Sequence, residues 1–416
     1  MGETLKYEIY ERGFKDRLRE NKDGLFIWAS LVINMIMVFV QRLYIGVMPD
    51  YIMSKFDIDI VGLSFMASAV FYGYAIFQIP SGILIDKVGV RKLNLFGASL
   101  TTISSFLFTV TNSFLIGWIA RFFIGLGTSM AVISIMKVQT LWFKRKYFSQ
   151  LSSLMAFISN IGMFAGTLPL AYMIARVGAN TSLHVITALN LISLIIMFIF
   201  VKDKKADIKE PNALKISKSL KEVFKNKRTY PPLMVMFFFI STMTSIMGLW
   251  GVNYVTNIYG VDKVNAAELV SFFTFGFIAG APFVSLMDKF LKGNYKANLL
   301  LATGFYTALW FYVLIIMNGK PPIEQIPLIF FLMGVAIMFH ILTFTVIKDV
   351  NFLKNSGIAT STANMMEFLG SGIVNFLIAF FIQQGIGIEK AFISILVFGI
   401  LSFISALFID YKDIEV

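Results

Sequence analysis

Residues 78–92 read QIPSGILIDKVGVRK, a run that begins apolar and ends with one acid and three bases within seven positions. The acid is Asp86, and the bases are Lys87, Arg91 and Lys92. The apolar segment before them is long enough to cross a bilayer as a helix, whereas charged side chains are costly inside it. The stretch therefore predicts a charged turn between two membrane-spanning helices.

The composition of the whole chain agrees with a membrane protein. Of its 416 residues, 57% are hydrophobic and 14% are charged, whereas soluble domains carry about 25% charged residues. Several apolar stretches reach the roughly 20 residues that a transmembrane helix needs, and no long alternating segments indicate a barrel. We expect an all-α polytopic membrane protein.

The chemistry-bearing residues exclude several function classes. The chain has no cysteine, so it can form neither a disulfide nor a thiolate metal site, and only His184 and His340 could supply imidazole. No G-x-x-x-x-G-K-[ST] phosphate loop occurs, which argues against direct use of ATP. We therefore expect no cofactor, no metal and no enzymatic activity.

Charged and Pro/Gly-marked breaks divide the chain into twelve predicted spans in two halves of six. The boundaries predict an amino tail (1–24), a first half (25–201), a linker (202–231), a second half (232–409) and a carboxyl tail (410–416). The spans are 25–48, 62–84, 93–111, 114–141, 150–175, 183–201, 232–257, 266–287, 297–317, 324–347, 357–383 and 391–409.

The basic residues predict the orientation. Loops on the side of both tails hold 28 of the 36 Lys and Arg residues, and the opposite loops hold five. The positive-inside rule then places both termini in the cytoplasm, with the chain in the cell membrane. Topology and anionic lipid headgroups account for the net charge of +12, so no nucleic-acid partner is needed.

The two halves echo each other across the polar linker. AIFQIPSGILID ends span two and FIAGAPFVSLMD ends span eight, and Pro80 precedes Asp86 by the same six positions as Pro282 precedes Asp288. This echo fits an internal repeat. The linker is interpreted as a solvated, lipid-facing connector, with a helical pattern over residues 214–224.

Two sequence motifs resemble those of a known family. GILIDKVGVRK (82–92) resembles, position for position, the loop-two-to-three signature G-x-L-x-D-x-x-G-x-R-K of the major facilitator superfamily, and RFFIGLG (121–127) resembles its fourth-helix motif. The resemblance implies a transporter of two rocking six-helix halves, expected as a monomer. It does not identify the substrate.

In this expected fold, the glycines and charged residues of the first motif have a physical role. Gly82 would allow a neighbouring helix to approach, and Asp86 could lie at the positive amino-terminal end of a facing helix and pair with Arg91 or Lys92. By resemblance, that helix is span eleven, which starts near residue 356. We expect Gly82, Asp86, Gly89, Arg91 and Lys92 to form a cytoplasmic gate, with Asp288 as the counterpart in the second half. The simpler alternative is a hairpin that only obeys the positive-inside rule.

Charged residues inside predicted spans are candidates for function by default. Arg42 lies ~17 residues, or about 25 Å, into span one beside Gln41, and Arg121 lies ~8 residues, or about 12 Å, into span four. The planar fork of an Arg suits a carboxylate, and some branches of the resembled superfamily that move organic anions have an Arg in the first helix. Arg42 and Gln41 are therefore candidates for substrate binding, against a structural pair of Arg42 with Asp50. For Arg121 a structural or coupling role is favoured.

Three further residues extend the predicted site. Lys137, about 10 Å from the cytoplasmic end of span four, either snorkels to the surface or lines the path. Glu367, within the polar run STANMMEFLGSG (361–372), lies near the midplane and could take up a proton or bind a substrate ammonium, against the alternative of a hydrogen-bonded packing residue. His340 has a titration range that suits proton coupling, although a lone His among Met, Phe and Ile is more often a packing residue.

These residues predict a secondary transporter for a small anionic or zwitterionic solute, such as an organic acid, amino acid or short peptide, with proton-coupled symport. Efflux of apolar drugs is the main alternative. Span five reads SNIGMFAGTLPLAYM (159–173) and lacks the adjacent Gly-Pro and Gly-Gly pairs of many drug antiporters in the superfamily, which disfavours it. A non-transporting sensor on the same fold is a third hypothesis.

Overall fold

The computed structural model describes residues 22–144, 147–203, 213–352 and 355–410, and of these it leaves out the side chains of residues 86, 149 and 213–217. Most of the predicted amino tail (1–24) and of the predicted carboxyl tail (410–416) lies outside the described residues, and residues 22–24 already belong to the first helix. Within the described ranges every regular element is helical, and twelve helical stretches are long and apolar enough to cross a membrane. The expected all-α fold with twelve spans is confirmed.

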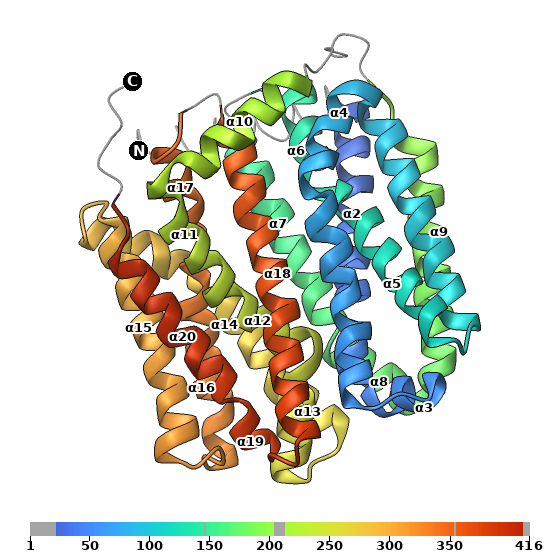
Figure 1. Cartoon of the computed structure of the whole chain (residues 1–416). Helices are drawn as coiled ribbons and strands as arrows, with labels where there is room; N and C mark the ends of the chain where they lie inside the picture. The colour runs from blue at the N-terminus through green and yellow to red at the C-terminus, as the bar shows by residue number, and fades with distance from the viewer. Residues whose placement is uncertain (1–21, 145–146, 204–212, 353–354, 411–416) are drawn as a thin grey trace, which may run out of the picture.

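The first six spans form one bundle, on the right in Figure 1. A single apolar stretch can satisfy its backbone groups in lipid only as a helix, which explains why the hydrophobic runs adopt this structure. The helices are α2 (Lys22–Leu43), α3 (Pro49–Phe56), α4 (Ile60–Val110), α5 (Phe114–Thr128), α6 (Met130–Trp142), α7 (Phe148–Ala165), α8 (Leu168–Val177) and α9 (Ala179–Phe200).

The last six spans form the second bundle, on the left in Figure 1. Span seven is irregular, because π-helical turns at Met236–Ile240 and Ile246–Trp250 separate its three short α-helices. The helices are α11 (Tyr230–Val235), α12 (Ser241–Ser245), α13 (Gly251–Tyr259), α14 (Lys263–Phe290), α15 (Tyr295–Phe311), α16 (Ile326–Met338), α17 (Ile341–Asp349), α18 (Ser356–Gln383), α19 (Ile388–Ala391) and α20 (Ile393–Leu407).

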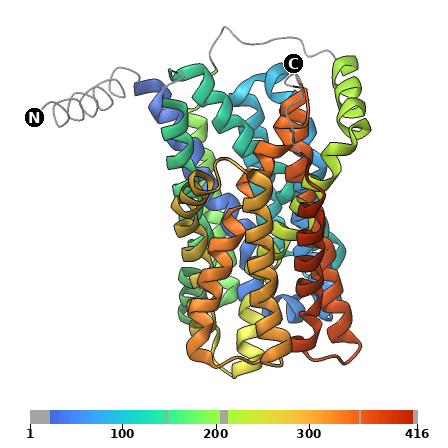
Figure 2. The same cartoon turned by 90° about the vertical axis from the view of Figure 1, so that its left-hand side faces the viewer.

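The two ends of the bundle are named here by the helices that lie there. The α10 face carries the linker helix α10 (Ala213–Lys225), and the α3 face carries α3, α8, α13 and α19 (Figure 1). Figure 2, turned by 90°, shows the same two ends from the side of the second bundle. Between these faces, large apolar side chains such as Ile103 (65% exposed) and Leu301 (54%) point outward, as expected for contact with lipid tails.

Small residues bring helices close together inside the first bundle. Gly125 of α5 packs directly against the backbone of Val70 in α4, and Gly127 packs against that of Gly97. A side chain at either position would collide with a carbonyl oxygen, so close helix packing explains the two glycines of RFFIGLG.

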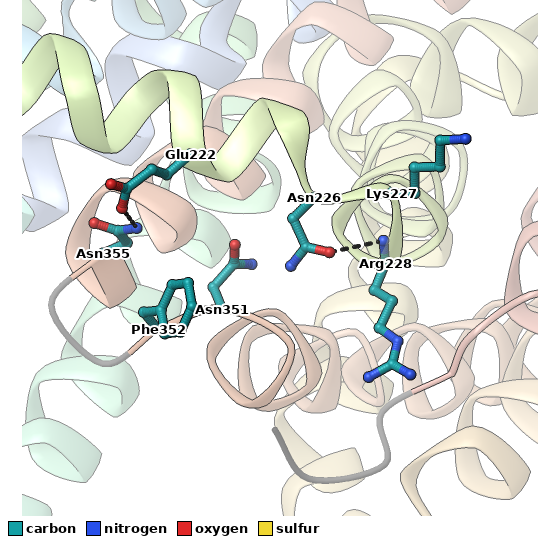
Figure 3. Close-up of a pocket in the computed structure, with 7 residues that line it drawn as sticks. All are labelled: Glu222, Asn226, Lys227, Arg228, Asn351, Phe352 and Asn355. Atoms are coloured by element: carbon teal, nitrogen blue, oxygen red, sulfur yellow. Dashed lines mark hydrogen bonds between the residues drawn. The ribbon is translucent and has the colours of Figure 1, made fainter. Parts of the chain in front are cut away.

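The helical pattern predicted in the linker is confirmed by α10. Lys221, Phe224 and Lys225 near its end are exposed, as expected of a solvated connector, but one side of the last turn packs on the second bundle. Val223 is fully buried, and Glu222 accepts a hydrogen bond from Asn355, the residue before α18, at 2.9 Å. A cavity of about 340 Å³ separates this contact from Lys227 and Arg228, as Figure 3 shows. The side-chain amide of Asn355, just before α18, is thus the donor that joins the linker helix to the second bundle.

Candidate functional site

Arg42 lies where the two bundles meet. It is the penultimate residue of α2 and is only 7% exposed. Its guanidinium carbon lies 4.2 Å from the ring centre of Tyr74 in α4 and 5.0 Å from that of Phe368 in α18. Phe39, one turn earlier on α2, adds a third ring at 5.3 Å. Rings from both halves therefore enclose this charge, an arrangement that favours a cation.

The guanidinium of Arg42 keeps one edge free. Its buried Nε and Nη2 atoms have no hydrogen-bond partner within the described part of the chain. The N–H bonds of these two atoms point in the same direction in the guanidinium plane, and together they form the fork that binds two coplanar oxygen atoms. The alternative pair with Asp50 is wrong, because Asp50 binds Lys263 instead.

Glu367 provides the opposite charge nearby. It lies beside Phe368 on α18 and is half-buried, and Arg42 is the charged group that acts on its carboxylate. The two residues are not in direct ion-pair contact. Instead, Oε1 of Glu367 accepts a hydrogen bond from Thr244 of α12 at 3.1 Å. An acid and a base thus share one region without neutralising each other directly.

Thr244 reaches this carboxylate from the irregular span seven. It lies in the short helix α12 between the two π-helical turns, and such turns occur frequently at functional sites. The second turn also brings Gly248 against Gly46 of the first half, where a Cβ on Gly46 would lie 2.9 Å from the carbonyl oxygen of Gly248. Span seven therefore packs directly against the end of span one at this point.

Arg121 is a structural residue in this conformation. It is fully buried, and its Nη1 donates to the carbonyl oxygen of Gln41 at 2.5 Å, while Nε and Nη2 donate to those of Met66 and Ala67 at 3.4 Å. The guanidinium also lies 4.8 Å from the ring centre of Tyr44. Each of its three nitrogen atoms thus donates to a backbone carbonyl oxygen, and these bonds hold spans one and two against span four.

Gln41 is not part of the site around Arg42. Its side chain is fully buried inside the first half, where Nε2 donates to Ser105 of span three at 2.9 Å. Neighbouring residues on a helix point about 100° apart, which explains why Gln41 and Arg42 face different partners.

The structure does not bring His340 or Lys137 to Arg42. Nδ1 of His340 is hydrogen-bonded to the carbonyl oxygen of Ile337 at 2.9 Å, and the ring stacks on Phe277, at a centroid distance of 5.8 Å. It occupies the break between α16 and α17, as a packing residue would. Lys137 is half-buried on α6.

The predicted gate residues lie apart from α18 in this conformation. A Cβ on Gly82 would meet only Cδ1 of Ile133, at 3.8 Å, so the expected close helix approach at Gly82 is absent here. A Cβ on Gly357, at the start of α18, would have no neighbour within 4 Å among the described residues. The side chain of Asp86 lies outside the described part, and so its predicted pairing does too.

The remaining gate candidates have partners within their own halves or face solvent. Nη2 of Arg91 donates to the carbonyl oxygen of Phe198 at 3.0 Å, and Nη1 donates to that of Val201. Lys92 is exposed. In the second half, Asp288 accepts a weak hydrogen bond of 3.4 Å from Asn298.

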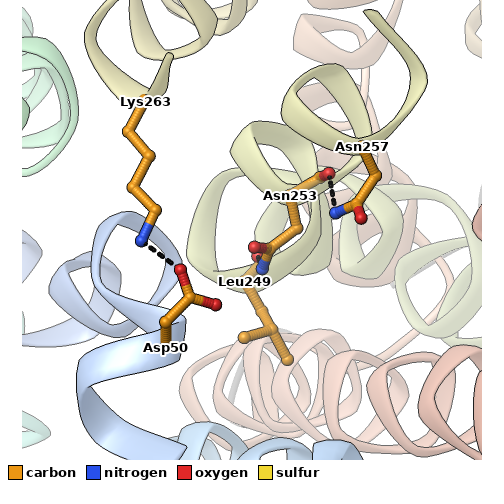
Figure 4. Close-up of polar contacts among 5 residues, drawn as sticks. All are labelled: Asp50, Leu249, Asn253, Asn257 and Lys263. Carbon is orange, nitrogen blue, oxygen red and sulfur yellow. Dashed lines mark hydrogen bonds and ion pairs between the residues drawn. The ribbon is translucent and has the colours of Figure 1, made fainter. Parts of the chain in front are cut away.

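The halves are joined near the α3 face. Lys263 of α14 pairs with Asp50 of α3 at 2.6 Å, as Figure 4 shows. Three further side-chain hydrogen bonds link α18 to α4 or to Asp59, the residue just before α4. They join Gln383 to Asp59 (2.6 Å), Asn375 to Ser68 (3.3 Å) and Asn364 to Tyr74 (3.4 Å). The side-chain hydrogen bonds that the structure describes between the halves thus run from the α3 face to the depth of Arg42.

Sequence reasoning missed three residues of this site. Tyr74 and Phe368 are aromatic residues in apolar spans, and no local signal separates them from lipid-facing rings. Thr244 lies in the polar run STMTS (241–245), which is unusual in a span and was the available signal. Among the described residues, no group of three or more His, Asp and Glu side chains could hold a metal ion.

Comparisons with known proteins agree with this architecture. Residues 30–375 match the sequence profile described as Major Facilitator Superfamily. The probable nitrate transporter NarT of Staphylococcus haemolyticus (strain JCSC1435) is 22% identical over 92% of this chain and 96% of its own. The quinolone resistance protein NorA of Staphylococcus aureus (strain MSSA476) is 24% identical over 73% of this chain and 76% of its own. The crystal structure of a D-xylose–proton symporter has a TM-score of 0.73 at 13% identity, covering 92% of this chain and 97% of that one, and shows the shared fold.

Proposed function

Because the chain belongs to the Major Facilitator Superfamily, whose members are transporters rather than enzymes, we propose that it carries a small anionic or zwitterionic solute across the cell membrane by alternating access. Arg42 binds the anionic group of the solute, and Glu367 exchanges a proton during the cycle. A monomer is sufficient, since both residues belong to one chain.

The free Nε–Nη2 edge of Arg42 carries this proposal. A buried charged group without hydrogen-bond partners is costly, and the cost is removed when a ligand supplies two oxygen atoms in the plane of the fork. Carboxylate and nitrate both present such a pair of oxygens. The description of NarT as a probable nitrate transporter supports a solute of this class.

Electrostatic interactions would couple the binding of an anion at Arg42 to the protonation of Glu367. An anion bound at Arg42 neutralises the positive charge that acts on Glu367, and it adds a negative charge near the carboxylate. Both effects favour the protonated form of Glu367. Anion binding and proton uptake therefore accompany each other, which is the requirement for symport.

The gate proposal concerns the α10 face. If this face is cytoplasmic, as the positive-inside rule predicts, the hydrogen bonds near the α3 face hold the outer side closed in this conformation. Closure of the inner side would then bring the 82–92 loop, with Asp86, against the start of α18. The Asp50–Lys263 pair and the bonds of α18 to α4 would break in the same step.

Uptake into proteoliposomes tests the proposed binding role. Arg42→Lys keeps the charge but loses the fork, so the affinity for the transported anion should fall about 10- to 100-fold, as expected for one lost charged hydrogen bond. Arg42→Gln should lower it further. Arg176→Lys, an exposed arginine at the α3 face, is the matched control and should transport like the wild type. Unchanged affinity for acetate, nitrate and amino acids in both Arg42 variants would contradict the proposal.

Glu367→Gln separates coupling from binding. Accumulation driven by a pH gradient should disappear in this variant, whereas exchange of solute across the membrane, which needs no net proton movement, should continue. Loss of both activities would assign Glu367 to the binding site, and preserved gradient-driven accumulation would remove it from the mechanism.

Drug efflux is a second candidate, favoured by one observation. The rings of Phe39, Tyr74 and Phe368 around Arg42 could bind an apolar compound, and NorA is described as a quinolone resistance protein. Efflux of ethidium or a quinolone from loaded vesicles, together with no uptake of anions, would support this candidate. Binding of an anion with neither uptake nor exchange would instead support a sensor.

A further inference from the structure

We propose that Asp203 is a positioning residue that holds the 82–92 loop in the geometry needed to close the α10 face; this inference rests on the gating role proposed for that loop. Asp203 follows the end of α9 and is exposed. It lies outside both sequence motifs, and no sequence signal marks it.

The first observation is the break inside α4. Gly89 has φ +83° and ψ 166°, so the helix of span two ends there and the helix of span three begins directly after it. The first N–H groups of a helix lack acceptors, and the residue before the helix normally provides one with its side chain. Gly89 has no side chain to do so. Oδ1 of Asp203 accepts the hydrogen bond from the backbone N–H of Arg91 at 2.9 Å and thus acts as the missing N-cap.

The second observation is the lack of space at Gly89. A Cβ there would lie 2.7 to 2.8 Å from the carboxylate atoms of Asp203, closer than real Cβ contacts. Residue 89 must therefore be glycine for two reasons: its φ is positive, and the Asp203 carboxylate leaves no room for a Cβ. The Asp203 carboxylate occupies the space that a side chain at position 89 would fill.

The third observation is a contact in the reverse direction. While Asp203 binds the backbone of Arg91, the Arg91 guanidinium donates to the carbonyl oxygens of Phe198 and Val201 at the end of α9. An acid lies at a helix amino terminus and a base at a helix carboxyl terminus, and each is stabilised by the local helix dipole. These contacts fix the loop on the end of span six.

The contacts of Asp203 affect the proposed gate because they hold the loop that carries Asp86. Asp86 lies three positions before Gly89, so the course of its backbone depends on how the loop is held. Without Asp203 the first turn of span three loses its cap, and closure of the α10 face against α18 becomes less favourable. The open population of that face should rise.

Cysteine labelling of the full-length protein in proteoliposomes tests this inference. The chain has no cysteine, so Gly357→Cys, at the exposed and uncrowded start of α18, gives a single reporter of the α10 face. Asp203→Ala should shift the equilibrium between the closed and open states of this face about fivefold toward the open state, the factor typical of a lost N-cap, and so raise the rate of maleimide labelling. Asp203→Asn should label like the parent, because its amide oxygen accepts the same bond. Lys202→Ala, the exposed neighbour, is the matched control.

Two outcomes would overturn the inference. If Asp86→Asn raises the labelling rate but Asp203→Ala does not, Asp203 has no positioning role although the gate is real; if neither does, the gate proposal fails as well. A thermal-unfolding cycle checks the contact independently of transport. Gly89→Ala should lower the Tm less in the Asp203→Ala background than in the parent, because the colliding carboxylate is absent, and additive Tm losses would contradict the contact.

Discussion

Breaking the Asp50–Lys263 ion pair should open the α3 face by a small and calculable factor. The pair joins the two halves at 2.6 Å, but its side chains are 73% and 35% exposed, respectively. Exposed ion pairs contribute about 0.2–1 kcal/mol, which corresponds to a change of about 1.4- to 5-fold in the equilibrium between closed and open states. Lys263→Gln should therefore raise the open population by that factor and leave the fold intact.

Labelling of Ser68→Cys provides the assay. Ser68 is 1% exposed and bonded to Asn375 between the halves, so a cysteine there should react with an impermeant maleimide only when the α3 face opens. The charge swap Asp50→Lys with Lys263→Asp should return the rate toward that of the parent, and added salt should raise the parent rate. Lys320→Gln, which changes an exposed lysine that forms no ion pair within the described residues, is the control. An unchanged rate in Lys263→Gln, or no recovery in the swap, would refute the reasoning.

Three further predictions follow from the described contacts. Arg121→Lys should lower the free energy of unfolding by about 2–3 kcal/mol, measured by denaturant titration in detergent, because one ammonium cannot reach three separate carbonyl oxygens. His340→Gln should leave the pH dependence of transport unchanged, because the ring is hydrogen-bonded to Ile337 and packed; an altered pH profile would return His340 to the coupling mechanism. Hydrogen bonds from the backbone N–H groups of Asn265 and Val264 hold the pKa of Asp262 below its usual range. Its stabilisation of α14 is therefore present above about pH 4 and is lost as the pH falls through the lowered pKa, and Asp262→Asn should remove that part of the acid-dependent fall in Tm.

The twelve spans could be predicted because each depends on local composition. A stretch of about 20 apolar residues satisfies its own backbone groups only as a helix, whatever its neighbours are. The same holds for the helical pattern of the linker, which α10 confirms. What α10 packs against could not be predicted, because the Glu222–Asn355 bond joins residues 133 positions apart.

The candidate site was predictable only in part, for the same reason. An Arg or Glu inside a span is costly wherever it lies, so composition identified Arg42, Arg121 and Glu367 as residues with a special role. Whether the donors of such a charged group are hydrogen-bonded depends on partners from other helices. Arg121 donates to three backbone carbonyl oxygens, whereas two nitrogen atoms of Arg42 have no hydrogen-bond partner in the described part of the chain and lie between rings from both halves.

The sequence by itself determined the membrane class, the span count and the two motifs, because hydrophobic length, charge and glycine spacing act over one or two helical turns. The tertiary structure alone decided which cation faces the interface of the halves, that Asp50 pairs with Lys263 and not with Arg42, and that Asp203 caps span three. Hydrogen bonds and ion pairs act over about 3 Å, and only the packing of helices from distant parts of the chain brings their donors and acceptors within that distance.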